Sequence, residues 1–193
     1  MKTVLISIKA GLEMKVSEDT QFVLDFSKSK HGDVHFVFDK AGVSAEIIGI
    51  YAARNNEDYQ LETIATHKAP HTSCVTYIKG VLFDNGKSEY VGRIIIEKSA
   101  QQTSSFLEDH VLIVGKNTHT NSEPILEIAA NDVKASHAAT TGRIDESQVY
   151  YLQSRGLSRY EAEEILVEGF FESFLNKIMD SDIKERIHRV WRI

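Results

Sequence analysis

The sequence predicts a mainly β protein that ends in a short helical tail. From Thr3 to about Ser136, short runs rich in β-branched and aromatic residues alternate with clusters of Gly, Asn, Asp, Ser and Lys, which is typical of strands joined by turns. After Arg143 the apolar residues recur instead with the 3.6-residue period of an amphipathic helix. We therefore expect a β core over residues 1–144 and a helical tail over residues 145–193.

The β core contains a series of apolar runs that we expect to be strands. They cover residues 4–8, 22–26, 34–38, 45–51, 59–66, 74–82, 90–97, 111–114 and 125–129. Without crossover helices, such a series is compatible with a sandwich, a barrel or a β-solenoid. Two features favour the solenoid: residues 47–50 and, after Arg93, residues 94–96 are apolar at successive positions, and small or hydroxylated residues crowd together at 101–105.

The tail contains two capping signals and a third helical segment. Asp145 followed by Gln148 predicts a capping box that opens a helix through Gln153, and Gly156 is placed to end this helix in a left-handed conformation. Ser158 and Glu161 form a second capping box, and the following apolar residues fall on one helix face: Ala162, Ile165, Leu166, Gly169, Phe170, Phe174, Leu175 and Ile178. A third short helix is expected over residues 182–190.

Composition and charge exclude several classes of protein. The 193 residues are 42% hydrophobic and 26% charged, as in an ordinary globular protein, and the net charge of -6 argues against a nucleic-acid partner. The N-terminal segment resembles neither a signal peptide nor a membrane span, so we expect no membrane partner. The lone cysteine, Cys74, excludes an intrachain disulfide and fits the reducing cytoplasm, which is the expected location.

The segment over residues 133–171 carries the most specific pattern in the chain. In order along the sequence it contains His137, Ala139-Thr140, Gly142, Asp145, Tyr150 to Leu152 and Arg155-Gly156. By these residues the chain resembles the SufB/SufD family, scaffold proteins of iron–sulfur cluster assembly, over about residues 45–178. The resemblance implies a right-handed parallel β-helix, and because family members commonly have several hundred residues, the chain is similar to a short, core-only form.

His137 is the candidate ligand that this resemblance singles out. Taken alone, a histidine in a polar turn after the last β run is more often a capping or packing residue than a metal ligand. SufD-type proteins carry a histidine at this place in the motif, and it is implicated in building the nascent cluster where SufB and SufD meet. Because a neutral imidazole can bind iron, the resemblance makes His137 the candidate metal and cofactor residue, with a transient iron–sulfur cluster as its cargo.

The departures from the family pattern point to SufD rather than SufB. SufB-type proteins flank this histidine with carboxylates, whereas here the neighbours are Ser136 and Ala138. They also place a cysteine in the preceding strand, where this chain has Asp109. SufD-type proteins often have a cysteine two residues before the histidine, and here that residue is Ala135. The thiolates that usually hold iron–sulfur clusters are therefore missing from the expected places.

The resemblance also implies two protein partners. In the family the helices that follow the Tyr-Leu and Arg-Gly motif dock the ABC-type ATPase SufC, so the candidate partner-binding residues are Tyr151, Arg155, Gly156, Glu161, Phe170 and Phe171. The neighbouring rings at 170 and 171 cannot point to the same helix face. One face is expected to pack on the β body, and the other is either free for a partner or covered by the last helix.

The second expected partner is another β-helix. The open end of a solenoid exposes unpaired strand backbone, which invites strand addition. We therefore expect a homodimer formed edge to edge near residues 133–141, or a heterodimer with a SufB-like paralogue.

The remaining motifs do not indicate an enzyme. His67, His71 and Cys74 could share a metal ion only if a turn at Pro70 brought them together. The other histidines show no metal-ligand spacing, and neither a Gly-x-Ser-x-Gly elbow nor a phosphate loop occurs. Two interpretations remain. The first is a cluster-assembly scaffold that couples the ATPase to the assembly interface, and His137 favours it. The second is a β-solenoid adaptor that binds the ATPase without holding a cluster, and the missing thiols favour it.

Overall fold

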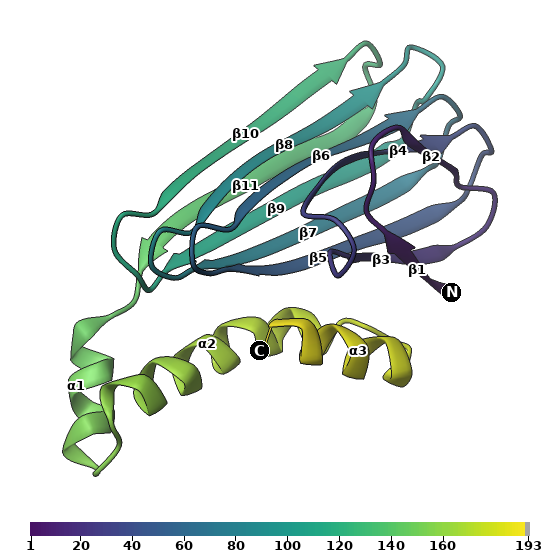
Figure 1. The fold of residues 1–193 in the computed structure, drawn as a ribbon. Helices are drawn as coiled ribbons and strands as arrows, with labels where there is room; N and C mark the ends of the chain where they lie inside the picture. The colour runs from purple at the N-terminus through teal and green to yellow at the C-terminus, as the bar shows by residue number, and fades with distance from the viewer. Residues whose placement is uncertain (192–193) are drawn as a thin grey trace.

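The computed structural model describes residues 1–191, which form a series of β-strands followed by helices (Figure 1). The strands are β1 (Lys2–Ser7), β2 (Leu12–Lys15), β3 (Thr20–Asp25), β4 (His31–Phe38), β5 (Ser44–Ala53), β6 (Asp58–His67), β7 (Ser73–Leu82), β8 (Lys87–Ile96), β9 (Thr103–Ile113), β10 (His119–Ile128) and β11 (Val133–Arg143). The helices are α1 (Glu146–Ser154), α2 (Arg159–Leu175) and α3 (Ser181–Trp191).

The strands form two parallel sheets. The odd-numbered strands pair in the order β1-β3-β5-β7-β9-β11, which we call the odd sheet, and the even-numbered strands pair as β10-β8-β6-β4-β2, the even sheet. Each strand therefore lies beside the strand two places away in sequence, and the chain alternates between the sheets as it coils (Figure 1). This arrangement is a flattened parallel β-helix, so the predicted fold class is confirmed.

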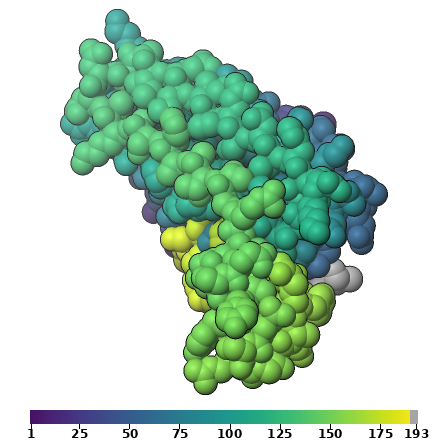
Figure 2. Space-filling view, turned by 90° about the vertical axis from the view of Figure 1, so that its left-hand side faces the viewer, coloured from purple at the N-terminus to yellow at the C-terminus, as the bar shows by residue number. Residues whose placement is uncertain are grey.

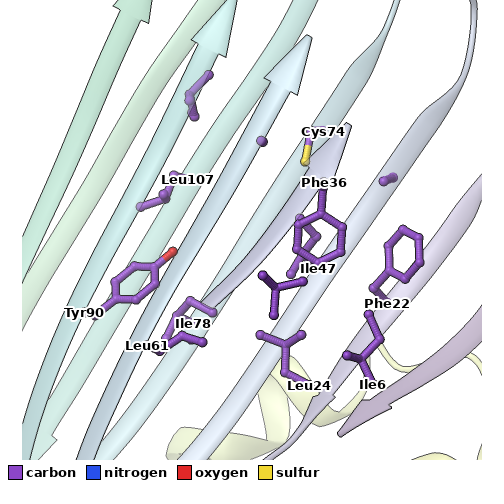
Figure 3. Packing of buried hydrophobic residues seen from close by; sticks show 14 of the residues in the cluster. Ile6, Phe22, Leu24, Phe36, Ile47, Leu61, Cys74, Ile78, Tyr90 and Leu107 are labelled. Carbon is purple, nitrogen blue, oxygen red and sulfur yellow. The ribbon is translucent and has the colours of Figure 1, made fainter. Parts of the chain in front are cut away.

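The main core lies between the two sheets. Every second residue of a strand points inward, because successive side chains of a strand face opposite sides. Inward residues of the odd sheet such as Leu24, Ile47 and Ile78 face Phe36 and Leu61 of the even sheet (Figure 3). This alternating stack buries the apolar runs that the sequence displays.

Two glycines make room for large neighbours inside this core. A Cβ atom added to Gly80 would lie 2.2 Å from the ring of Tyr51, and one added to Gly92 would lie 2.1 Å from the side chain of Leu107. These separations are far below van der Waals contact. A larger residue at either position would therefore force the neighbouring side chain to move within a packed core.

Helices α2 and α3 cover the outer face of the odd sheet. Their residues Val167, Phe171 and Ile187 belong to a second apolar cluster together with Ile48 and Val81 of the sheet. The cluster explains why several strands of this sheet are apolar on both faces. Helix α1 and the beginning of α2 extend beyond the β body and form a separate lobe (Figure 2).

Polar contacts fix the tail to the first coils. The buried Gln21 donates from Nε2 to the carbonyl oxygen of Lys177 at 2.7 Å and accepts from the Met179 amide at 2.9 Å. The carboxylate of the buried Asp25 accepts from Arg186 at 2.7 Å. The buried side chains of Gln21 and Asp25 thus form hydrogen bonds with residues of the tail. These bonds place α3 on the sheet in one defined position.

The strand boundaries differ from the sequence-based expectation in several places, among them β10, which begins at His119 rather than at residue 125. β2 was not expected, because its four residues alternate too briefly to stand out. β9 begins at Thr103 rather than at residue 111, so the hydroxyl-rich segment at 103–105 belongs to a strand and not to a corner. β11 continues through Arg143, so the polar turn expected after Ser136 is wrong. In each case parallel pairing with the neighbouring coil determines the structure of a segment whose own β propensity is weak.

The helix boundaries agree closely with the sequence, but two details differ. The Ser158–Glu161 capping box is confirmed, and Gly156 has the expected positive φ of 95°. Asp145 caps α1 through the amide of Ser147, not through the expected box with Gln148.

The expected apolar face of α2 is also partly wrong. Ile165 is 46% exposed and Gly169 is exposed, whereas Val167 and Phe171 are buried. The helix is rotated so that this second set of residues meets the sheet. No helix within residues 1–191 is long and apolar enough to cross a membrane.

Candidate functional site

His137 lies in the middle of β11, the terminal strand of the odd sheet. It pairs in register with Leu107 of β9, which is buried in the main core. Because paired residues of a parallel sheet point to the same side, His137 belongs to the inner face of its sheet. β11 has a neighbour on one side only, so this inner-face histidine is exposed at the open end of the β-helix.

The local sequence explains this placement. Val133 and Ala135 pack against the main core, and alternation along the strand puts His137 and Ala139 on the same face. The small residues around His137 resemble a turn in isolation. Pairing with β9 along the whole length from Val133 to Arg143 holds them in a strand.

Asp109 lies directly beneath this end of the β-helix. It lies on β9 and pairs with Ala139, two residues after His137 on β11. It therefore faces the inner side of the sheet, one strand below His137. Its side chain is fully buried, and both carboxylate oxygens lack a hydrogen-bond partner among the described residues. Burial raises the pKa of Asp109 to about 6. The site therefore combines one exposed imidazole with one desolvated carboxylate.

The family resemblance marks Asp109 only as the residue that stands in place of a SufB-type cysteine. A stronger signal was available: an acidic residue occupies an inward position of an alternating strand, between Leu107 and Val111. Charged residues are almost never fully buried without a partner, so such a position marks a candidate site.

His67, His71 and Cys74 do not converge on a metal ion. The ring nitrogens of the buried His67 hydrogen-bond to the hydroxyls of Thr72 and Ser105 at 2.8 and 3.2 Å, and burial lowers its pKa to about 4. His71 is exposed in a turn with a φ of 58°. Across the part of the chain that the structure describes, no group of three or more His, Cys, Asp or Glu residues could hold a metal ion.

Cys74 is also unsuited to act as a ligand in this conformation. It is fully buried in the main core (Figure 3), and burial raises the pKa of its thiol to about 12. Metal binding requires a thiolate with access to the metal. The single cysteine is therefore a core residue here.

The α1–α2 hairpin carries an exposed aromatic surface. Tyr150, Tyr151 and Tyr160 are 74%, 56% and 66% exposed. Arg155 lies over the ring of Tyr151 at 5.2 Å and donates to its hydroxyl at 3.3 Å, while Gly156 reverses the chain between the helices. Large rings that remain in solvent on a protruding lobe (Figure 2) are typical of a protein-binding surface.

The other predicted partner-binding residues are divided between the surface and the core. Glu161 is exposed, although its carboxylate accepts from the Ser158 amide at 2.7 Å. Phe170 is partly covered, and Phe171 is fully buried on the odd sheet. Phe171 therefore lies outside the exposed surface of the hairpin. Tyr150, Tyr160 and Ile165 belong to that surface but were not predicted, because neither periodicity nor the motif separates them from core residues.

A shallow apolar groove runs along the hairpin between its two helices. It has a volume of about 360 Å³ and is lined by Ser147, Gln148, Tyr151, Leu152, Ile165 and Leu166. An ionic clamp connects the same helices, because Arg159 donates to Glu146 at 2.7 and 2.9 Å and to Glu163 at 2.7 Å. The clamp is exposed and contributes little stability by itself, but it orients α1 on α2.

Comparison with known proteins assigns the family. Residues 10–170 match the family described as SUF system FeS cluster assembly, SufBD core domain. The chain belongs to the SufBD family. The matched region contains the β-helix from β2 onward, His137, helix α1, and helix α2 as far as Phe170.

Individual relatives of this SufBD protein agree with the assignment. The chain is 31% identical over 158 residues to an iron–sulfur cluster assembly SufBD family protein of Mycobacterium leprae, covering 78% of this chain and 40% of the relative. It is 33% identical over 109 residues to SufD of Escherichia coli and 35% identical over 108 residues to SufD of Bacillus subtilis, covering 56% of this chain in both cases. These alignments cover 26% and 25% of the two SufD proteins. The chain thus spans well under half the length of these relatives. Its family supports a role in iron–sulfur cluster assembly.

Proposed function

We propose that this protein is a scaffold component of an iron–sulfur cluster assembly complex and not an enzyme. In this proposal His137 contacts the nascent cluster, which is the cargo of the complex. The observation that carries the proposal is the position of His137: an exposed imidazole on the inner face of the terminal strand, in a chain of the SufBD family. The lone, buried thiol fits a reducing compartment, and we place the complex in the cytoplasm.

The residues of this chain can supply part of the ligand set of an iron–sulfur cluster, but not all of it. A cluster usually needs four ligands, most of them thiolates, and Cys74 is buried. His137 would supply one neutral nitrogen, and the buried Asp109 would hold negative charge beneath it. We propose that the remaining ligands come from a second protomer, because β11 has unpaired backbone groups along its outer edge.

That protomer is either a second copy or a SufB-like paralogue. Two terminal strands meeting edge to edge about a two-fold axis would pair these backbone groups and bring the two open ends together. In a homodimer each site would contain two imidazoles and no thiolate from this chain. In a heterodimer, the paralogue would supply the thiolates.

Anaerobic reconstitution with ferrous iron and sulfide tests the scaffold role. We expect the wild-type protein, mixed with a SufB-like partner where it does not assemble alone, to gain iron and a visible absorption band, and His137→Ala to lose most of both. His119→Ala is the matched control, since His119 is exposed on β10 of the same terminal coil. Equal iron content in wild type and His137→Ala would reject His137 as a ligand.

We infer that the hairpin of α1 and α2 docks an ABC-type ATPase related to SufC. The exposed tyrosines and the apolar groove between the helices support this assignment. ATP-driven movement of the ATPase would then act on the lobe that continues directly from β11. The role of the hairpin is therefore conformational coupling between the ATPase and the site strand.

Point variants test this docking better than truncation does. Tyr151→Ala and Ile165→Ser change the groove while leaving the cover of the odd sheet intact. We expect each to weaken binding of a purified SufC-type ATPase by tenfold or more, about 1.4 kcal/mol, measured by calorimetry. Glu185→Ala, on exposed α3 surface, is the control. Unchanged affinity in both groove variants would contradict the assignment.

The second candidate function is an adaptor that binds the ATPase and holds no cluster. It is favoured by one observation, the absence of an accessible thiol in this chain. An adaptor would bind the ATPase normally, remain colourless after reconstitution with every partner, and show no dependence on His137.

A further inference from the structure

The outer face of the odd sheet carries a row of polar side chains that reaches the edge strand. Lys79 of β7 pairs in register with His110 of β9, and His110 pairs in register with Thr140 of β11. Paired residues of a parallel sheet point to the same side. The three side chains therefore lie side by side across the sheet, on the face opposite to His137.

One end of this row contacts helix α2. The ammonium group of Lys79 donates to the carbonyl oxygen of Phe170 at 2.6 Å and to the hydroxyl of Ser173 at 2.7 Å. It also lies 4.2 Å from the ring centre of Phe174. The same Phe174 ring meets the His110 ring edge to face, with 6.0 Å between centres. Helix α2 thus contacts two successive members of the row.

The other end of the row is hydrogen-bonded to β11. Nε2 of His110 lies 2.6 Å from the carboxylate of Glu108, which accepts a hydrogen bond from the ring N–H. In the neutral ring this leaves Nδ1 as the acceptor for the Thr140 hydroxyl, to which it is hydrogen-bonded. Within the described residues, Thr140 is the one β11 residue whose side chain hydrogen-bonds to another strand. This contact joins the edge strand to its neighbour beyond the backbone ladder.

We propose that His110 is a positioning residue that couples helix α2 to the strand carrying His137. Thr140 lies three residues after His137 on the same strand. A displacement of α2 moves Phe174 against the imidazole, and the imidazole passes this displacement to Thr140 and so to β11. The proposal rests on the proposed function in one respect: the coupling bears on cluster assembly because His137 contacts the cluster. The coupling between α2 and β11 is itself a property of the folded chain.

The row is suited to this task because it combines directional contacts with an apolar cover. Hydrogen bonds lose energy steeply with misalignment, so a small movement of the ring changes the Thr140 contact. Burial of Lys79 under α2 removes water from the first part of the row. Energetic coupling is carried by such contiguous packed and hydrogen-bonded networks, and direct measurement is the criterion that establishes it.

Amide hydrogen exchange of the full chain, followed by mass spectrometry, provides that measurement. The readout is the exchange rate of a peptide spanning β11, normalised to one from the central strand β5. We expect Thr140→Val and His110→Phe each to raise β11 exchange about threefold or more, because each removes the side-chain bond to β11. His110→Phe keeps a ring beside Phe174. Thr141→Val, the neighbouring threonine on the other face of the strand, is the control and should change β11 exchange little.

A double-variant cycle separates coupling from general destabilisation. We expect Phe174→Leu to raise β11 exchange in the wild type and to add nothing in the His110→Phe background. Phe171→Leu is matched to it, since Phe171 is a buried ring of the same helix. If Phe171→Leu raises β11 exchange as much as Phe174→Leu does, or if the effects of Phe174→Leu and His110→Phe add fully, the proposal is overturned.

This test requires neither iron nor the ATPase. A positive cycle together with a colourless reconstitution would leave the coupling intact and reject the scaffold role. A negative cycle together with a cluster that depends on His137 would do the reverse. The two failures are therefore distinguishable.

Discussion

At the residue scale, Asp109 makes the stability of the protein depend on pH. Its folded pKa of about 6 lies above the ordinary value of 3.8 because burial disfavours the charged carboxylate. The folded state therefore binds this proton more tightly than the unfolded state does. The resulting contribution to stability is complete below about pH 4 and is lost as the pH rises to about 6.

Asp109→Asn should consequently stabilise the protein at neutral pH. We expect a gain on the order of 2 kcal/mol in the free energy of unfolding at pH 7.5, because the variant carries no buried charge, and a much smaller gain at pH 4.5. Urea unfolding at both pH values measures it. Asp132→Asn, in the exposed turn before β11, should change stability little at either pH. An equal effect of Asp109→Asn at both pH values would show that the carboxylate is solvated.

Lys79 has the opposite kind of shift on the outer face of the sheet. Burial lowers its pKa from 10.5 to about 8, with Lys177 acting in the same direction and Glu108 opposing both. The unfolded state therefore holds this proton more tightly, so the folded state becomes relatively more stable as the pH rises from about 8 to 10.5.

Lys79→Met removes this charge and the pH dependence that comes with it. We expect wild type to gain stability relative to Lys79→Met between pH 7.5 and pH 10, as read from the difference between their denaturant midpoints. Lys98→Met, at an exposed position, controls for the general change in net charge. A constant difference across this pH range would contradict the shift.

At the scale of single elements, two glycines in the tail should respond oppositely to the same substitution. Gly156 ends α1 with a φ of 95°, where an L-residue is strained, whereas Gly169 lies exposed within α2. A Cβ atom would meet nothing within 4 Å at either position, so backbone conformation alone decides the outcome.

We expect Gly156→Ala to destabilise the protein by about 1 kcal/mol and Gly169→Ala to stabilise it by about 0.5–1 kcal/mol. Thermal unfolding monitored by circular dichroism measures both, and each variant serves as the control for the other. Shifts of the same sign would mean that packing, not backbone conformation, governs these sites.

The accuracy of the sequence-based prediction also varies by element. Most central strands were predictable because their alternating apolar residues are long enough to show the pattern, as in β6 and β8. The extent of β11 was not predictable, because its Ala, Ser and Gly residues have little β preference of their own and are held by pairing with β9. The polar row through His110 is equally invisible in the sequence, since it depends on the register between strands.

At the scale of the whole molecule, the tail is part of the fold as well as a docking lobe. Helices α2 and α3 bury Ile48, Ile50 and Val81 on the outer face of the odd sheet. A chain that ends at Arg143 would expose this face to water.

We therefore expect truncation after Arg143 to give a protein that self-associates and binds an apolar dye, as measured by sedimentation velocity and fluorescence. Truncation would abolish ATPase binding for this reason alone, so it is no test of the docking surface. A monomeric, cooperatively unfolding truncation product would show that the β-helix is independent of its helical cover.

The stacking of coils has a consequence for how the molecule can vary in length. Each coil contacts mainly the coil before it and the coil after it, and His137 lies on the final one. Additional rungs placed before β1 would pair with that strand without altering the spacing between His137, Asp109 and the hairpin. Proteins with the same terminal coil can therefore differ greatly in length while keeping the same arrangement of side chains at that end of the β-helix.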